Sequence, residues 1–235
     1  MKLLEVMNVS KRFGGIIALN SVSMHIESGE ILGLIGPNGS GKTTLINVIS
    51  GFYKCDDGKI FFKGTEITHL PTFKRSGIAR TFQVTRAFEN LTTIENVILA
   101  SYANTHDLAK SEERALEILE KLGLSHRMDI PARNLTLLER KRLELARAMA
   151  REAELLLLDE VMAGLKPYEI DELAEVLKEF NERGTSMMIV EHVMRSVRKL
   201  CNRVIVLHEG VKIAEGSFEE VSKDPNVRKA YLGEE

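Results

Sequence analysis

Short apolar runs alternate with amphipathic segments in the second half of this chain. The runs occupy residues 155–158, 186–190 and 204–207, and apolar residues at helical spacing occupy 168–180 and 192–200 between them. Strands of a parallel sheet that is covered on both faces have this composition, and helices usually connect them. The pattern therefore predicts an α/β fold with a mostly parallel sheet.

The first quarter of the chain predicts strands of a different kind. Residues 31–35 form another apolar run, whereas residues 21–27 alternate polar and apolar positions, which is typical of a strand with one solvated face. A turn at 56–58 precedes a short strand at 59–62. We expect the strands at 21–27 and 59–62 to belong to an N-terminal antiparallel β subdomain beside the core.

A helical segment separates the two halves. Apolar residues at helical spacing occupy 93–101, 111–122 and 137–151. We interpret residues 91–150, approximately, as an inserted α-helical subdomain within a single domain of residues 1–235. The nucleotide-binding core then comprises residues 1–90 and 151–235. Near the end, Ser217-x-x-Glu220 is a capping box that predicts a short terminal helix.

A glycine-rich loop lies between the 31–35 strand and a helix-compatible run that begins at Thr44. Backbone N–H groups of such a loop surround phosphate, and the helix N-terminus adds positive potential. Lys42 is expected to reach the β- and γ-phosphates, and the Thr43 hydroxyl to bind Mg²⁺. These features predict a P-loop NTPase (RecA-like) core. The residues assigned to the nucleotide are Gly36, Pro37, Asn38, Gly39, Ser40, Gly41, Lys42, Thr43 and Thr44.

Two carboxylates follow the apolar run at 155–158. In open α/β sheets, ligands bind at the carboxyl ends of the strands, where Asp159 and Glu160 are expected to lie. Asp159 is assigned to Mg²⁺, directly or through water, and Glu160 to the general base for the attacking water. Acidic residues often simply end strands, but beside a phosphate loop the catalytic interpretation is favoured.

Composition limits the partners and the compartment. The formal net charge of −2 provides no field for nucleic acid or an anionic membrane surface. Cys55 and Cys201 are too few for a disulfide framework, which favours a reducing cytosol. No apolar run approaches the roughly 18 residues that span a bilayer. We expect a cytoplasmic protein with no direct membrane insertion, which contacts a membrane only through a partner.

With these motifs in place, essentially the whole chain resembles the ATP-binding cassette family. Phe13 stands where the family's aromatic residue stacks on adenine, and His192 where a histidine contacts the γ-phosphate. Gln83 matches the glutamine that links the Mg²⁺ site to the helical subdomain and the transport partner. Taken alone, Phe13 also fits a core phenylalanine and His192 a structural histidine. No Asn-Lys-x-Asp motif for guanine is visible, which favours ATP.

A narrower resemblance is to the ATPase subunits of branched-chain amino-acid importers and their amide and urea relatives. The segments that carry it are residues 11–15, 79–83, 142–148, 163–165 and 230–233.

The family's signature, Leu-Ser-Gly-Gly-Gln, is altered here to residues 135–139, Leu-Thr-Leu-Leu-Glu. The resemblance places Thr136 against the γ-phosphate of ATP bound by a second subunit. From the residues alone, Thr136-x-x-Glu139 is a capping box that begins a helix. The cations at 140–142 either compensate the charge of Glu139 or form a solvated helix face. Lys166 replaces the family's usual aspartate, and Val161-Met162 replaces Pro-Ser/Thr.

The resemblance implies a motor subunit that uses ATP and Mg²⁺. Two such chains, identical or paralogous, would sandwich two ATP molecules and move membrane-embedded permease subunits through a groove near Gln83. Two alternatives stay open: a soluble cassette ATPase of a cytosolic assembly, and a nucleotide sensor with weak turnover. A small-molecule phosphoryl transferase is less favoured, because nothing suggests an acceptor site.

Overall fold

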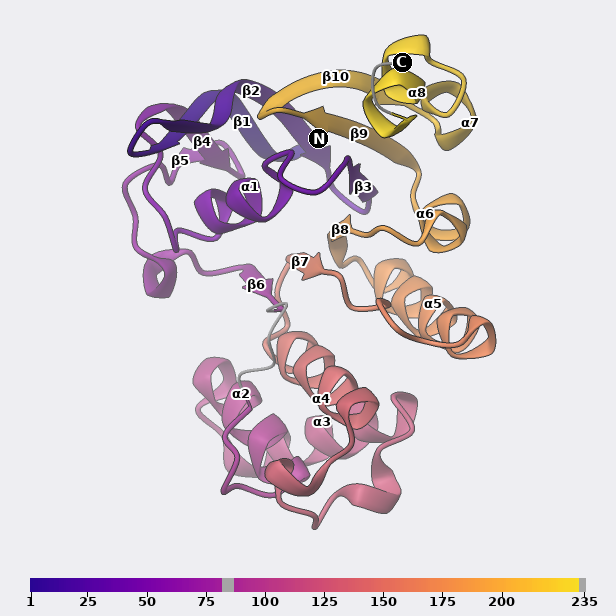
Figure 1. Cartoon of the computed structure of the whole chain (residues 1–235). Coiled ribbons are helices and arrows are strands. Elements are labelled where there is room, and N and C mark those ends of the chain that lie inside the picture. The colour runs from indigo at the N-terminus through magenta and orange to yellow at the C-terminus, as the bar shows by residue number, and fades with distance from the viewer. Residues whose placement is uncertain (82–86, 233–235) are drawn as a thin grey trace.

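The larger sheet of the protein has the strand order β10-β9-β3-β8-β7-β6 (Figure 1). The structure is a computed structural model that describes residues 1–81 and 87–232. Strands β6 to β9 pair in parallel with one another and with β3, and β10 joins antiparallel to β9. The strands are β3 (Ile31–Ile35), β6 (Ile78–Arg80), β7 (Leu155–Asp159), β8 (Ser186–Val190), β9 (Arg203–His208) and β10 (Val211–Gly216).

The second sheet is antiparallel, with the order β2-β1-β4-β5. One buried apolar cluster contains side chains of this sheet, of the larger sheet and of helix α1 (Lys42–Ile49). This sheet therefore covers the helix that follows the phosphate loop. Its strands are β1 (Lys2–Phe13), β2 (Ile16–Glu27), β4 (Asp57–Phe62) and β5 (Thr65–Glu66).

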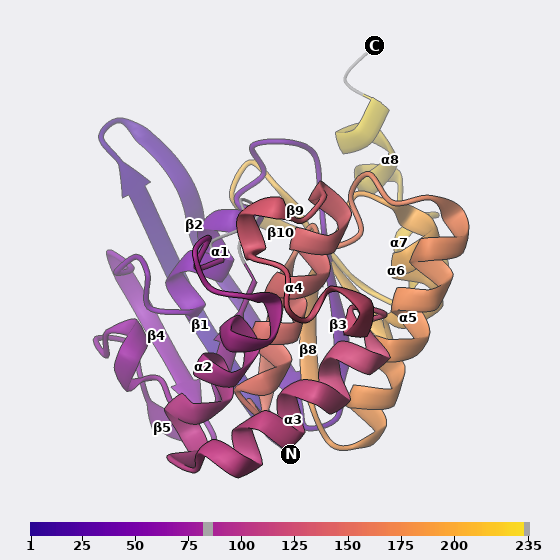
Figure 2. The ribbon, with the colours of Figure 1, turned by 90° about the horizontal axis from the view of Figure 1, so that it is seen from below.

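Three helices form a separate group below the sheets in Figure 1: α2 (Thr93–Thr105), α3 (Leu108–Lys121) and α4 (Leu137–Ala150). Seen from below, they lie in front of the sheet, with α5 (Pro167–Glu182) beside them (Figure 2). The last helices lie near β9 and β10, and they are α6 (Met194–Leu200), α7 (Phe218–Val221) and α8 (Pro225–Leu232). Short 3-10 helices span Thr72–Lys74, Ser125–Arg127 and Ala132–Asn134.

Strand β7 shows why the apolar runs are continuous. Leu155 and Leu157 belong to the cluster that contains α1, whereas Leu156 and Leu158 belong to the cluster that contains α4 and α5. All four side chains are at most 1% exposed. Both faces of the strand are covered, so neither face tolerates polar side chains.

The expected α/β fold with a mostly parallel sheet and an antiparallel N-terminal sheet is confirmed. The capping boxes at Thr136 and Ser217 are also present. The sequence did not predict β1, β5, β6 or α8, and α6 begins two residues later than the predicted helix. The division into core and helical subdomain stays an interpretation.

Candidate functional site

The phosphate loop needs glycine at two positions for steric reasons. A Cβ at Gly36 would lie 2.1 Å from the Leu207 carbonyl oxygen, and one at Gly41 would lie 2.5 Å from the Ala18 carbonyl oxygen. Gly41 has φ +101° and begins α1 without a side-chain cap. The first N–H groups of α1 are therefore left to bind an anion.

Lys42 is held inside its own loop. Its Nζ donates to the carbonyl oxygens of Gly36 and Pro37, each at 2.8 Å, and lies 3.4 Å from Ser40 Oγ. Burial lowers the pKa of this ammonium, while Glu160 and Asp159 act in the opposite direction. The amine lies in the loop at the point where phosphate oxygen atoms would replace the carbonyl partners.

Asp159 ends β7, and its carboxylate is buried. Its side chain is 2% exposed, and neither carboxylate oxygen has a hydrogen-bond partner among the described residues. Burial is the largest cause that raises the pKa of this carboxyl, and Glu160 adds to it, whereas Arg80 and Lys42 oppose it. Its backbone N–H donates to Thr81 Oγ1 at 3.0 Å.

A divalent cation would supply the partner that Asp159 lacks, so the residues fit Mg²⁺. The described part of the chain holds no cluster of three or more His, Cys, Asp or Glu side chains able to bind a metal. The cation would therefore depend on Asp159, a hydroxyl such as that of Thr43, and phosphate oxygens.

Glu160 and His192 form a pair across two strand ends. His192 Nε2 lies 2.9 Å from Glu160 Oε1, and the Glu160 backbone N–H donates to the Val190 carbonyl at 2.9 Å. Glu160 has φ +52°, an uncommon conformation for a residue other than glycine. The backbone is thus turned sharply after β7, and the carboxylate is placed beside His192.

One cavity of about 800 Å³ brings most of the predicted residues together. Three neighbouring residues that the sequence did not single out, Ile16, Ile17 and Ala18, also line it. The predicted residues among its lining are Asn38, Gly39, Ser40, Gly41, Lys42, Thr43, Thr44, Glu160 and His192. The space joins the phosphate loop to the Glu160–His192 pair, as hydrolysis of a bound nucleotide requires.

Phe13 does not line this cavity. Its ring packs edge-on against Tyr53, with centroids 5.2 Å apart, and Lys11 Nζ lies 5.4 Å from its centre. The ring is nevertheless 43% exposed. Adenine stacking by Phe13 therefore stays a prediction.

The altered signature begins α4, away from the cavity of its own chain. Thr136 Oγ1 accepts from the Glu139 N–H at 3.3 Å and donates to Glu139 Oε2 at 3.0 Å. The charge of Glu139 is compensated by Arg127 Nε at 2.8 Å, while Arg140 binds backbone carbonyls instead. Leu137 is 71% exposed at this helix start.

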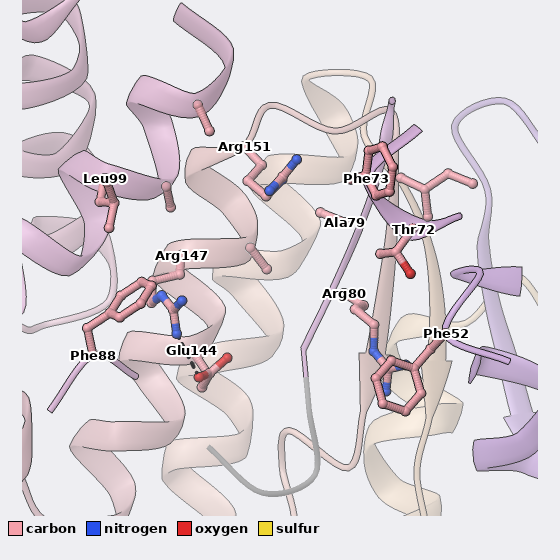
Figure 3. A pocket seen from close by; sticks show the side chains of 14 residues that line it. Phe52, Thr72, Phe73, Ala79, Arg80, Phe88, Leu99, Glu144, Arg147 and Arg151 are labelled. Carbon is pink, nitrogen blue, oxygen red and sulfur yellow. Dashed lines mark hydrogen bonds and ion pairs between the residues drawn. The ribbon is translucent and has the colours of Figure 1, made fainter. Parts of the chain in front are cut away.

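Gln83 lies outside the described residues. A groove of about 600 Å³ lies near the segment that precedes it, between the core and the helical group. Figure 3 shows Arg80, Phe52 and Phe73 on the core side and Phe88, Glu144 and Arg147 on the helical side. Phe73 is 82% exposed and Phe88 is 50% exposed. The groove thus offers aromatic rings and cations together.

Three further residues reach the site, although the sequence patterns did not assign them to it. Glu191 is fully buried beside His192, and Lys141 extends from α4 to the carbonyl groups of Glu160 and Ala163. Burial raises the pKa of the phenol of Tyr231, on α8, and the backbone of Gly36 acts in the opposite direction. These contacts are long-range, so residue spacing could not reveal them.

Comparison with known proteins gives matches along the whole chain. The family model described as "ABC transporter" matches residues 19–163, and that described as "Branched-chain amino acid ATP-binding cassette transporter" matches 211–235. The Archaeoglobus fulgidus protein named "Probable branched-chain amino acid transport ATP-binding protein LivG" is 42% identical over 247 residues, which cover 99% of this chain and 96% of the relative.

Solved structures agree with these matches. An ATP-binding cassette of an ABC transporter in its ADP conformation has a TM-score of 0.88 and 33% identity, with full coverage of both chains. A dimeric cassette in a post-hydrolysis state, bound to ADP and Pi, has a TM-score of 0.84 and 27% identity, covering 92% of this chain and 98% of that one. Within residues 1–81 and 87–232, no helix has the length and apolar character needed to cross a membrane.

Proposed function

Because this chain belongs to the ATP-binding cassette transporter family, in its branched-chain amino-acid group, we propose that it hydrolyses ATP to power an importer of branched-chain amino acids or related amides. The observation that carries the proposal is the single cavity that joins the phosphate loop to Glu160 and His192. Phosphoryl transfer needs little from a protein beyond such positioning and charge neutralisation.

Each residue of the site has its own role in this proposed reaction. The loop N–H groups and Lys42 bind the phosphates, and the buried position of Lys42 strengthens this interaction. Glu160 accepts the proton of the attacking water, and His192 holds the Glu160 carboxylate and reaches the γ-phosphate. Thr43, Asp159 and Gln83 would hold Mg²⁺, which when bound neutralises charge on the β- and γ-phosphates.

The partners are a second ATPase subunit and membrane-embedded permeases at the cytoplasmic face of the membrane. The exposed start of α4, with Thr136 and Leu137, is available to face the nucleotide of a second copy or a paralogue. The dimeric cassette with ADP and Pi supports this arrangement. The groove of Figure 3 offers the permease an aromatic and cationic docking surface.

Substitution of Lys42 tests the function directly. Lys42→Ala should lose most nucleotide affinity and ATP turnover, whereas Lys110→Ala, on the exposed face of α3, should retain both. Near-normal turnover in Lys42→Ala would refute the phosphate role. Co-purification of the tagged chain from its native membrane with integral membrane subunits supports the importer, whereas exclusive recovery with soluble partners would indicate a cytosolic assembly.

A further inference from the structure

Residues 160–163 form a turn directly after β7, and backbone hydrogen bonds hold it. The Ala163 N–H donates to the Glu160 carbonyl at 3.3 Å, and the Glu160 N–H donates to the Val190 carbonyl of β8 at 2.9 Å. Because Glu160 adopts φ +52°, the direction of its side chain depends on how this turn is held.

Glu191 holds the turn from the side of β8. Its side chain is 0% exposed, and Oε1 accepts the Met162 N–H at 2.7 Å. Oε2 has no hydrogen-bond partner in the described part of the chain. A buried carboxyl with incomplete hydrogen bonding costs stability, so an aliphatic side chain would fill the space more favourably. The carboxyl therefore serves the turn rather than the packing.

Lys141 holds the same turn from the side of the helical group. It lies on α4, two residues after the altered signature, and its Nζ donates to the Ala163 carbonyl and, at 3.5 Å, to the Glu160 carbonyl. The side chain is half-buried rather than part of a solvated helix face. Lys141 thus connects α4, which begins with the altered signature, to the 160–163 turn of the same chain.

We propose that Lys141, on α4, and Glu191, directly after β8, are positioning residues that both hold the 160–163 turn and so link the position of α4 to the direction of the Glu160 carboxylate. Glu191 accepts a backbone N–H of the turn, and Lys141 donates to two of its carbonyls. A displacement of α4 is transmitted to Glu160 through Lys141. The inference rests on the proposed role of Glu160 as the base.

The test compares variants of the full-length chain in steady-state ATPase assays, with thermal unfolding in parallel. Lys141→Met keeps the aliphatic stem and removes the donor, so kcat should fall about tenfold while the KM for ATP stays within twofold. Lys141→Arg restores a donor and should recover part of kcat. Lys178→Met, in an exposed pair with Glu175 on α5, is the matched control and should leave kcat unchanged.

Glu191→Gln keeps an oxygen that accepts the Met162 N–H and should retain most of the turnover, whereas Glu191→Met should lose it at unchanged KM. Combining Lys141→Met with Glu191→Met should cost less in kcat than the product of the two single effects, because both disturb one turn. If Glu191→Met does not fold, the Lys141 series decides alone.

Two results would overturn the inference. One is unchanged kcat in Lys141→Met; the other is a loss of kcat that merely follows a lower unfolding temperature and a higher KM. Glu160→Gln, measured beside them, separates this outcome from failure of the proposed function. If Glu160→Gln also retains turnover, the assignment of Glu160 as the base is wrong. If Glu160→Gln loses turnover while the Lys141 and Glu191 variants keep the kcat of the unmodified chain, only the positioning role of Lys141 and Glu191 is refuted.

Discussion

His192 Nε2 lies 2.9 Å from Glu160 Oε1, although 32 residues separate the two along the chain. The contact exists because β7 and β8 are adjacent parallel strands, with Asp159 opposite Val190, so that the residues after both strands meet at one sheet edge. The pair fixes where a proton can be accepted in the cavity. It is therefore the first place to test the chemistry.

Glu160→Gln should bind ATP and hydrolyse it slowly. The amide keeps the size of the side chain but cannot act as a base, so turnover should fall by roughly 10²–10⁴-fold. Size-exclusion chromatography with Mg-ATP should show an accumulated dimer, whereas the control Glu182→Gln at the end of α5 should behave as the unmodified chain does. Strictly monomeric elution at high protein and ATP concentrations would argue against the sandwich.

Asp159→Asn should change both the Mg²⁺ requirement and the stability. Because the carboxylate is buried with no hydrogen-bond partner among residues 1–81 and 87–232, its neutral replacement should raise the free energy of unfolding in EDTA by about 1–3 kcal/mol. The same variant should need at least about tenfold more Mg²⁺ for half-maximal turnover, since it loses a charged ligand.

A magnesium titration and a denaturant titration measure these two effects. Asp171→Asn, an exposed partner of Arg195 and Lys199, serves as the control and should leave the Mg²⁺ requirement unchanged. An unaltered Mg²⁺ requirement in Asp159→Asn would remove Asp159 from the metal site.

Glu191 should make stability depend on pH near neutrality. Burial raises its pKa to about 7 from an ordinary value of 4.5, so between these pH values the folded chain holds a proton that the unfolded chain has lost. The free energy of unfolding therefore decreases as pH rises through this window. Relative to Glu191→Gln, the unmodified chain should lose of the order of 1–3 kcal/mol between pH 5 and pH 8. Parallel stability curves for the two proteins would contradict this assignment.

Tyr231→Phe should weaken nucleotide binding without abolishing turnover. Burial raises the pKa of the Tyr231 phenol and the Gly36 backbone acts in the opposite direction, which places the phenol close to the phosphate loop. Val227 of the same helix packs in the cluster that contains Ile35. Removal of the hydroxyl takes away a polar group beside Gly36, and a polar contact corresponds to about 1 kcal/mol, so the Kd for ATP should rise by roughly two- to fivefold. Titration with a fluorescent nucleotide analogue measures it, and Tyr102→Phe on α2 should leave the Kd unchanged. An unchanged Kd in Tyr231→Phe would show that α8 does not support the loop.

Several parts of the site could be predicted from the sequence because they depend on neighbouring residues alone. The phosphate loop, the apolar strands and the Thr136–Glu139 capping box each follow from residues within a few positions of one another. The position of Asp159 and Glu160 directly after an apolar run also predicted that they lie at the sheet edge where the cavity is found. Local sterics and strand burial are sufficient for these features.

The partners of charged side chains were decided by the tertiary structure. The residue spacing offered the cations at 140–142 as compensation for Glu139, whereas the folded chain pairs Glu139 with Arg127 and turns Lys141 to the carbonyls of Glu160 and Ala163. The burial of Glu191 and the packing of Phe13 against Tyr53 likewise depend on segments distant in the chain. Long side chains reach whichever group the fold brings within a few ångströms. The sequence by itself therefore determined the phosphate loop and most of the helices and strands around it, and only their packing decided what faces Glu160.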